Sequence, residues 1–247
     1  MKRNSAEMTK FVIQMAGTCI GVVALYEDTA RFCTDYMCQE TADFTVTMAR
    51  EDIDLERKMS AREDQLHGRR TQPHTDEYLE TIALQRKITQ ELLSRDVLLF
   101  HGSTIAVDGE SFLFTAVSGT GKSTHTQLWR EMLGEKVVMV NDDKPFLKIT
   151  DEDVFACGSP WNGKHKLGNN IHVPLRAICI LERGEENEIH EISAKEALPM
   201  VFQQTHRPKK VFQYMELIDR LTQKVKFYRM RCTPTPEAAQ MAYEAMK

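Results

Sequence analysis

The residues best suited to chemistry lie in the segment AVSGTGKST, residues 116–124. Its glycines, Gly119 and Gly121, allow successive backbone N–H groups to turn inward and form a nest that binds an anion. Lys122 has the position of a side chain that reaches the β- and γ-phosphates of a nucleotide, and the Ser123 hydroxyl has that of a Mg²⁺ ligand. A helix beginning at Ser123 would add the positive end of its dipole. The segment therefore predicts a phosphate-binding loop for ATP and Mg²⁺.

The residues on both sides of the loop support this prediction. The apolar run SFLFTAV, residues 111–117, is typical of a strand that leads into such a loop, and STHTQLWREMLG is typical of a helix that Gly134 ends. The loop departs from the pattern GxxxxGK[ST] at Ala116, which replaces the first glycine. The alternative is a glycine-rich turn before a helix that binds no phosphate. The residues that we expect to bind the nucleotide are Ser118, Gly119, Thr120, Gly121, Lys122, Ser123 and Thr124.

An acidic pair, Asp142 and Asp143, follows the loop at a spacing that returns the chain to it. The intervening helix carries the chain away by about 16 Å at 1.5 Å per residue. The strand EKVVMV then brings it back by about 20 Å at 3.3 Å per residue. A carboxylate at this place can hold Mg²⁺, and a second one can deprotonate an attacking hydroxyl. We assign Asp143, with Ser123, to the metal and Asp142 to the general base; the reverse assignment and a merely solvated acidic turn stay open.

The elements that must position these residues form a mixed pattern. The run FVIQMAGTCIGVVALY, residues 11–26, predicts two short strands around a turn, and the charged run at 51–76 predicts a surface helix that passes into a linker. Residues 78–96 have apolar side chains at helical spacing. The dipeptide Asp108–Gly109 predicts a hairpin turn. Because strands and helices do not alternate strictly, we expect an α/β fold with a mixed, partly antiparallel sheet.

Composition argues against several classes of function. The net charge is −4, from 32 basic and 36 acidic side chains, which argues against nucleic acid as a partner. No apolar stretch reaches the roughly 18 residues that span a bilayer, and the first residues lack the apolar core of a secretory signal, so we expect no membrane partner. The six cysteines contain no CxxC pair. They predict buried, reduced thiols in a cytoplasmic protein rather than a metal site or a disulfide framework.

The region around the loop resembles the C-terminal domain of HPr kinase/phosphorylase. In that family a segment beginning HG, two short strands, GxSGxGKS and a strand ending ADD form the nucleotide site. This sequence has HGSTIAVDGESFLFTAVSGTGKS at 101–123 and VNDD at 140–143, in the same order. SGTGKST is also similar to the loop of phosphoenolpyruvate carboxykinases, GLSGTGKTT, which is closely followed by GDDE. The resemblance implies an HPr kinase/carboxykinase-type P-loop fold and phosphoryl transfer to a serine-like hydroxyl.

The resemblance also implies roles for single residues. His101 matches the family's histidine beside the loop, close to the phosphates, and a core histidine at a strand end is the alternative. Lys122, Ser123, Asp142 and Asp143 match directly. The glutamate-bearing signature of true HPr kinases and the substrate-binding arginines of carboxykinases have no match here. The chain therefore resembles most the HPr-kinase-like proteins that phosphorylate small hydroxyl compounds or other acceptors.

A second glycine-rich segment, GSPWNGKHKLGNN at 158–170, follows the acidic pair. We expect it to close over the substrate and exclude water, with Trp161 as an aromatic platform. Lys164 is a candidate catalytic cation that stabilises the transferred phosphoryl group or binds a substrate carboxylate. An exposed loop with scattered charge is the alternative. Arg207 is a candidate for a second phosphate clamp.

These features predict a small N-terminal α/β lobe at residues 1–74 and a P-loop, HPr-kinase-like catalytic domain at residues 75–247. We expect an ATP- and Mg²⁺-dependent kinase that transfers the γ-phosphoryl group to a hydroxyl of a small metabolite. Two alternatives stay open: a protein-serine kinase of the HPr kinase type, and a non-catalytic nucleotide sensor. The short chain argues against a carboxykinase-like lyase. Because the related kinases often form rings or dimers, a homo-oligomer is a further expectation.

Overall fold

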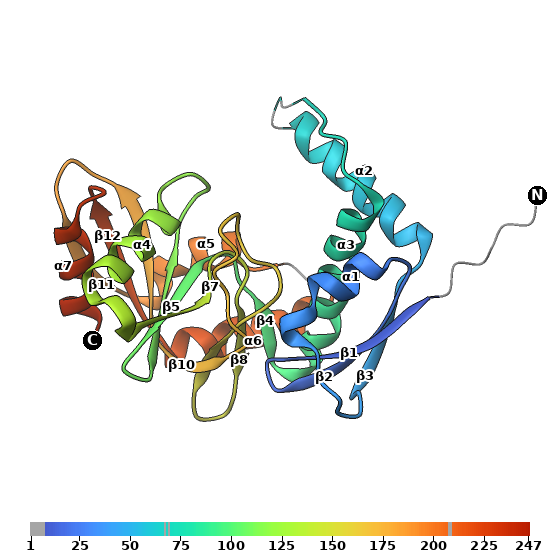
Figure 1. The fold of residues 1–247 in the computed structure, drawn as a ribbon. Helices are drawn as coiled ribbons and strands as arrows, with labels where there is room; N and C mark the ends of the chain where they lie inside the picture. Colours follow the sequence, from blue (N-terminus) through green and yellow to red (C-terminus); the bar gives the residue numbers. More distant parts are fainter. Residues whose placement is uncertain (1–7, 67, 69, 207–208) are drawn as a thin grey trace, which may run out of the picture. The chain divides into compact units, whose positions relative to one another are not determined.

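The computed structural model describes residues 8–66, 68, 70–206 and 209–247. The chain divides into two compact units, Met1–Glu91 and Leu92–Lys247, which are drawn in Figure 1. This division lies further along the chain than the lobe boundary that we placed near residue 74. The difference concerns one helix, α3 (Asp76–Leu92), which belongs with the N-terminal strands.

The N-terminal unit is a small three-stranded sheet with helices. Strands β1 (Thr9–Met15) and β2 (Thr18–Ala24) form the predicted hairpin, and β3 (Phe44–Thr47) pairs parallel to β2. The other elements of this unit besides α3 are α1 (Glu27–Phe32), the 3₁₀ turn η1 (Thr34–Tyr36) and α2 (Arg50–Leu66). The charged run therefore begins as a helix, as expected.

Helix α3 is tied to this unit by a buried carboxylate. Glu80 is fully buried and accepts hydrogen bonds from the backbone N–H groups of Leu25 and Tyr26, at 2.6 and 3.1 Å. The Thr29 hydroxyl donates a further hydrogen bond to it at 2.5 Å. Because a buried charge needs such partners, separating α3 from the N-terminal strands would leave Glu80 unsatisfied.

The C-terminal unit is built on one mixed sheet. Its described residues contribute nine strands in the order β4-β8-β9-β10-β6-β5-β7, with β12 pairing to β10 and β11. The strands are β4 (Val97–Leu99), β5 (Ser103–Val107), β6 (Glu110–Thr115), β7 (Val137–Asn141), β8 (Phe146–Ile149), β9 (Val154–Cys157), β10 (His172–Arg183), β11 (Glu188–Ile192) and β12 (Lys226–Cys232). Strand β10 runs parallel to β6 and β12 and antiparallel to β9. The expected mixed, partly antiparallel α/β sheet is therefore confirmed.

Helices cover both faces of this sheet, because its central strands carry apolar side chains on both faces. Phe114 of β6 and Cys179 of β10 pack with Trp129 in a core on the first face of the sheet. Leu113 and Ile178 point to the other face and pack in a second core. The helices are α4 (Lys122–Leu133) and α7 (Pro236–Met246) on the first face, and α5 (Ala194–Gln204) and α6 (Val211–Lys224) on the second.

Two turns follow from local sequence. Asp108 and Gly109 have φ angles of 51° and 87° and join β5 to β6, so the hairpin prediction is confirmed. The helix expected to 96 ends as α3 at Leu92 and continues as the 3₁₀ turn η2 (Leu93–Arg95), after which Asp96 adopts a left-handed conformation.

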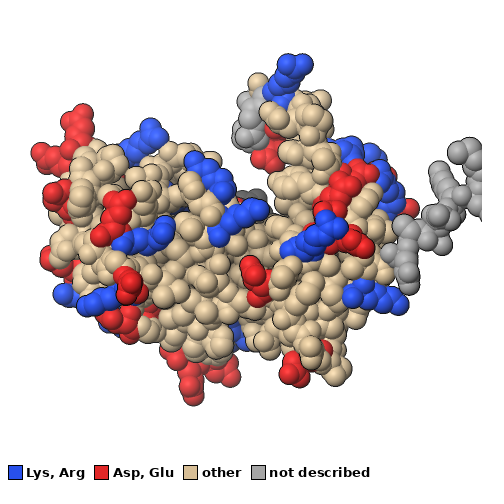
Figure 2. All heavy atoms as spheres, viewed as in Figure 1, with Lys and Arg blue, Asp and Glu red and all other residues tan. Residues whose placement is uncertain are grey.

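No helix among the described residues is long and apolar enough to cross a membrane. Acidic and basic side chains are interspersed over both units on the face that Figure 2 shows. All six cysteines lie within the described residues and none forms a disulfide. The prediction of buried thiols is confirmed for four of them and is wrong for Cys38 and Cys232, which are partly exposed.

Candidate functional site

Three segments meet at one edge of the large sheet. Strand β5 lies between β6 and β7 and is antiparallel to both, so β6 and β7 run parallel and end at the same edge. The loop at 116–121 follows β6, the acidic pair follows β7, and His101 lies just before β5. The topology therefore brings together segments that the sequence separates.

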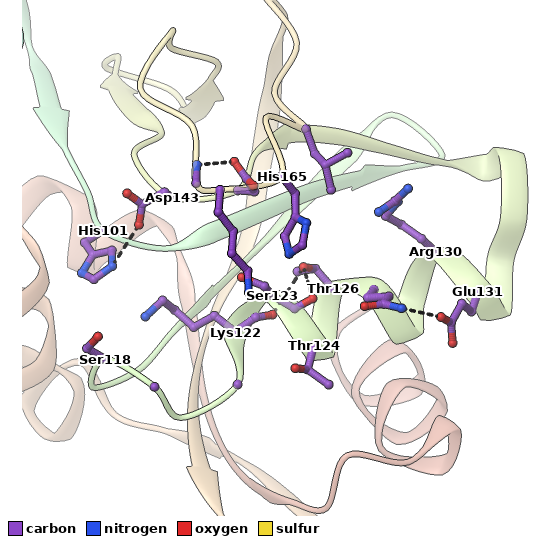
Figure 3. A pocket seen from close by; sticks show the side chains of 17 residues that line it. His101, Ser118, Lys122, Ser123, Thr124, Thr126, Arg130, Glu131, Asp143 and His165 are labelled. Atoms are coloured by element: carbon purple, nitrogen blue, oxygen red, sulfur yellow. Dashed lines mark hydrogen bonds and ion pairs between the residues drawn. The ribbon is translucent and has the colours of Figure 1, made fainter. Parts of the chain in front are cut away.

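These segments line a large cavity of about 910 Å³, seen in Figure 3. The sequence-predicted residues that line it are His101, Ser118, Gly119, Gly121, Lys122, Ser123, Thr124, Asp142, Asp143 and Lys164. Thr120 does not line it; this residue lines a second cavity of about 330 Å³, which we call the side cavity. The expected return of the acidic pair to Lys122 is thus observed, whereas the role of each residue stays a prediction.

The loop has the backbone conformation that its glycines permit. Gly119 and Gly121 have φ angles of 81° and 123°, which residues with a Cβ rarely adopt. The Lys122 ammonium donates a hydrogen bond to the Ala116 carbonyl at 3.2 Å. Ala116 itself is fully buried in the core beneath α4. Burial lowers the pKa of Lys122, and the nearby charge of Asp143 counteracts this effect.

Asp143 lies between two basic side chains. Its Oδ1 is 3.1 Å from His101 Nε2, and its Oδ2 accepts a hydrogen bond from Lys144 Nζ at 3.0 Å (Figure 3 shows the first contact). Burial alone would raise the pKa of Asp143, but hydrogen bonds and charge from His101 and Lys144 outweigh burial and lower it to about 2. Asp143 is therefore an anion at any physiological pH.

Asp142 has different surroundings. It is only 6% exposed, and its Oδ1 accepts a hydrogen bond from the Gly163 N–H at 2.7 Å. A Cβ on Gly163 would lie 3.1 Å from Oδ2 of Asp142, so the absence of a side chain permits this close approach. The glycine-rich segment 158–170 thus supplies one backbone donor to the acidic pair. We call His101, Asp142 and Asp143 the acidic end of the large cavity.

Sequence reasoning missed Asn141, which fixes the turn that carries the acidic pair. Its Oδ1 accepts hydrogen bonds from the backbone N–H groups of Asp143 and Lys144, at 2.8 and 2.5 Å. Its Nδ2 donates to the carbonyl and hydroxyl of Ser159, at 3.0 and 3.1 Å. Ser159 in turn donates to the Lys144 carbonyl at 2.6 Å. An Asn directly before two acidic residues is an Asx-turn pattern that could have indicated the first half of this network.

The backbone at His101 is fixed just as closely. Its N–H donates to the Gln204 carbonyl at 2.7 Å, and its carbonyl accepts from the Thr115 hydroxyl at 3.0 Å. The next N–H, of Gly102, donates to the Asp143 carbonyl at 3.0 Å. A Cβ on Gly102 would lie 2.7 Å from the side chain of Leu113. The His-Gly pair is therefore shaped by close packing between β5, β6 and the acidic turn.

Gln127, Arg130 and Glu131 of α4, together with Lys164 and His165, also line the large cavity, and we call these five residues its outer end. Figure 3 shows Arg130 and Glu131 far from His101, with His165 between them. Gln127 donates a hydrogen bond to Glu131 at 2.8 Å. Within the described part of the chain, neither Arg130 nor Lys164 forms an ion pair.

One predicted member of the site lies elsewhere. The expectation that Trp161 forms an aromatic platform in the site is wrong, because this side chain is only 4% exposed and does not line the large cavity. It packs edge-on against Phe146 with ring centroids 6.4 Å apart. A large indole gains more free energy from burial than from a position in solvent. The predicted phosphate clamp Arg207 lies outside the described residues.

Comparison with known proteins places the site within a family. A family model described as "SynChlorMet cassette protein ScmC" matches residues 69–235. The chain belongs to this family. The ScmC match spans every residue that lines the two cavities.

Two further comparisons add little to this assignment. Among solved structures, the Hpr(Ser) kinase/phosphatase from Coxiella burnetii overlaps with a TM-score of 0.37 at 12% identity, over 59% of this chain and 93% of that one. An overlap of this extent assigns neither an activity nor a substrate. No curated protein matches the chain.

Proposed function

We propose that this chain is an ATP- and Mg²⁺-dependent kinase that transfers the γ-phosphoryl group to a hydroxyl of a small metabolite. One observation carries the proposal: a glycine-rich loop before a helix, Lys122 and two carboxylates in different surroundings line a single cavity. Phosphoryl transfer depends on positioning and on neutralising charge, and these groups can supply both.

The residues present fit a triphosphate and Mg²⁺. The loop amides and the N-terminus of α4 suit the phosphates, and Ser123 and Asp143 offer the oxygen ligands that Mg²⁺ prefers. Among the described residues, no group of three or more His, Cys, Asp or Glu side chains could hold a metal by itself. Mg²⁺ would therefore bind together with the nucleotide, and when bound it neutralises the developing charge on the phosphates.

The two carboxylates suit different roles. Asp143 interacts with Lys122 through its charge and stays ionised, which favours it as the metal ligand. Asp142 is buried beside Gly163, and its Oδ2 accepts no hydrogen bond from a described residue. In the proposed reaction the acceptor oxygen forms a bond to the γ-phosphorus, the bond from that phosphorus to the β–γ bridging oxygen breaks, and the acceptor proton moves to Asp142.

The other catalytic candidates surround this reaction centre. His101 positions Asp143 from the side opposite to Lys144. Lys164, on the segment that contacts Asp142 through Gly163, would stabilise the transferred phosphoryl group or bind a carboxylate of the acceptor. A cavity of about 910 Å³ lies within the range of about 300–1,000 Å³ that is typical of small-molecule sites, which favours a metabolite over a protein segment.

The test is transfer from γ-labelled ATP with Mg²⁺ and a metabolite extract, comparing the native chain with Asp142→Asn. We expect a labelled small molecule, with a rate about 10²- to 10⁴-fold lower for the variant because it lacks the base. ATP affinity should be retained. Asp153→Asn, at an exposed position outside both cavities, is the matched control and should behave as the native chain.

The other outcomes discriminate between the alternatives. Label on a protein only would favour the protein-serine kinase. Tight ATP binding without any transfer would favour the nucleotide sensor. Full activity of Asp142→Asn would remove this residue from the chemistry.

A further inference from the structure

We infer that the side cavity binds the base and ribose of the nucleotide, so that the chain selects a nucleoside triphosphate over an inorganic polyphosphate. This inference rests on the proposed function only in that the phosphates lie on the loop at 116–121. It assigns a role to a surface that the proposed reaction does not use.

The first support is that the loop itself connects the two cavities. Gly119, Gly121 and Thr124 line both of them. A nucleotide with its γ-phosphate at Lys122 has its α- and β-phosphates on the loop amides. The rest of the nucleotide must then leave the loop near the first turn of α4, where Thr124 lines both cavities.

The second support is the chemistry of the side cavity's wall. Leu128, Cys232 and Pro234 offer apolar surface, and no carboxylate is among the residues that line the cavity. His125 lines it as a neutral ring: burial lowers its pKa to about 4, and its Nε2 accepts a hydrogen bond from Trp129 Nε1 at 3.1 Å. A mostly apolar cavity with a few polar groups is typical of sites for small organic ligands.

Arg183 is the third support. It lines the side cavity and donates a hydrogen bond to the Gly119 carbonyl at 2.7 Å. This contact holds the planar guanidinium beside the loop, where its face can stack on an aromatic base. The hydroxyls of Thr120 and Thr233, which also line the cavity, are suited to hydrogen bonds with a ribose.

The two cavities therefore have complementary uses. The outer end of the large cavity is charged, with Arg130, Glu131 and Lys164, and suits a polar acceptor better than a neutral base. With the nucleoside in the side cavity, the outer end of the large cavity stays free for the acceptor. The volume of the side cavity, about 330 Å³, is at the lower end of the range for ligand sites, about 300–1,000 Å³.

The test is calorimetric binding of ATP and of inorganic triphosphate to the full chain, each with Mg²⁺. We expect ATP to bind at least tenfold more tightly, since only ATP has a group for the side cavity. Equal affinity would overturn the inference. The result is independent of catalysis. A preference for ATP without any transfer would support nucleoside binding in the side cavity and contradict the kinase. Equal affinity and equal transfer from both donors would support a kinase and contradict nucleoside binding in the side cavity.

Substitutions in the side cavity test whether the preference for ATP over triphosphate arises there. Leu128→Asp places a carboxylate in the side cavity, and we expect it to lower the affinity for ATP about tenfold and to leave that for triphosphate unchanged. Since Leu128 also packs against the core, thermal unfolding must show that this variant folds. Arg183→Ala, at an exposed position, gives an independent answer: the ratio of ATP to triphosphate affinity should fall, and an unchanged ratio would contradict the inference.

The matched control is Arg176→Ala. Arg176 is exposed on the same strand, β10, but next to Leu175, which pairs with Ser111 at the start of β6. Arg183 lies beyond Ile180, which pairs with Thr115 where β6 leads into the loop. We expect Arg176→Ala to keep the native preference for ATP, and a loss of preference there would show that the effect is not local.

Discussion

The acidic end and the outer end of the large cavity differ in how the protein supports their charges. At the acidic end, Asp143 contacts His101 and Lys144, and Asp142 accepts the N–H of Gly163. At the outer end, Arg130 and Lys164 form no ion pair with any described residue. The fold therefore fixes the acidic end before any ligand binds, whereas the outer end keeps charges that a ligand can satisfy.

This difference agrees with what the proposed reaction requires. Groups that act on developing charge gain most when they are already oriented, because no reorganisation is then needed during the reaction. Groups that recognise an acceptor can lie on exposed positions and adapt to it. We expect substitutions at the acidic end to change stability, pH dependence and rate, and those at the outer end to change recognition or transfer with little effect on stability.

The largest effect on stability is expected for Asn141→Ala. This buried side chain makes four hydrogen bonds in the acidic turn, and its loss leaves buried partners unsatisfied. The free energy of unfolding should fall by about 1–3 kcal/mol, as measured by chemical denaturation. The control Asn169→Ala removes one hydrogen bond, to the Met139 carbonyl, and should cost less. An equal loss in both variants would contradict the special role of the acidic turn.

Gly163→Ala should lower the rate of phosphoryl transfer by about tenfold, since a displacement of a fraction of an ångström at a reacting group is costly. The added Cβ would lie 3.1 Å from Asp142 Oδ2 and must displace the loop or the carboxylate. The free energy of unfolding should stay within about 0.5 kcal/mol of the native value. Lys166→Ala, in the same loop but not lining the cavity, should transfer phosphate at the native rate.

The pH dependence of stability tests the contacts of Asp143. Its pKa is lowered from 3.8 to about 2 in the folded chain, so its stabilising contribution is fully present above pH 3.8 and is lost as the pH falls through about 2. In His101→Ala the pKa of Asp143 should rise, and the loss of stability should begin at a higher pH. Unfolding measured between pH 2 and 5, with carboxyl carbon chemical shifts, checks this. The exposed His190→Ala is the control, and an identical shift there would contradict a local cause.

The smallest effect on the fold is expected for Lys164→Ala. The side chain is exposed, so the free energy of unfolding should change by less than about 0.5 kcal/mol. ATP affinity should stay the same while phosphoryl transfer falls, because the cation acts on the transferred group or on the acceptor. Lys195→Ala, exposed and remote from both cavities, should change neither quantity. A loss of stability in Lys164→Ala would contradict the expectation that only the acidic end contributes to the stability of the fold.

The sequence by itself determined the local features of this protein. Three features depend only on residues close together in the chain and could therefore be predicted: the glycines of the loop, the Asp108–Gly109 turn and the amphipathic helix before residue 96. Even the approach of Asp142 to Lys122 followed from the rise per residue of one helix and one strand. The ends of elements were less well predicted, because they depend on packing at a distance.

Only the tertiary structure decided which long-range partners complete the site. Nothing near Asn141 in the sequence indicates Ser159 as its partner, and nothing near Asp142 indicates the N–H of Gly163. Trp161 is buried because Phe146 and the core offer it apolar surface, which no local pattern reveals. The same holds for the side cavity, whose wall joins the first turns of α4 to the ends of β10 and β12. Such contacts depend on how distant strands are ordered in the sheet, and that order is a property of the whole fold.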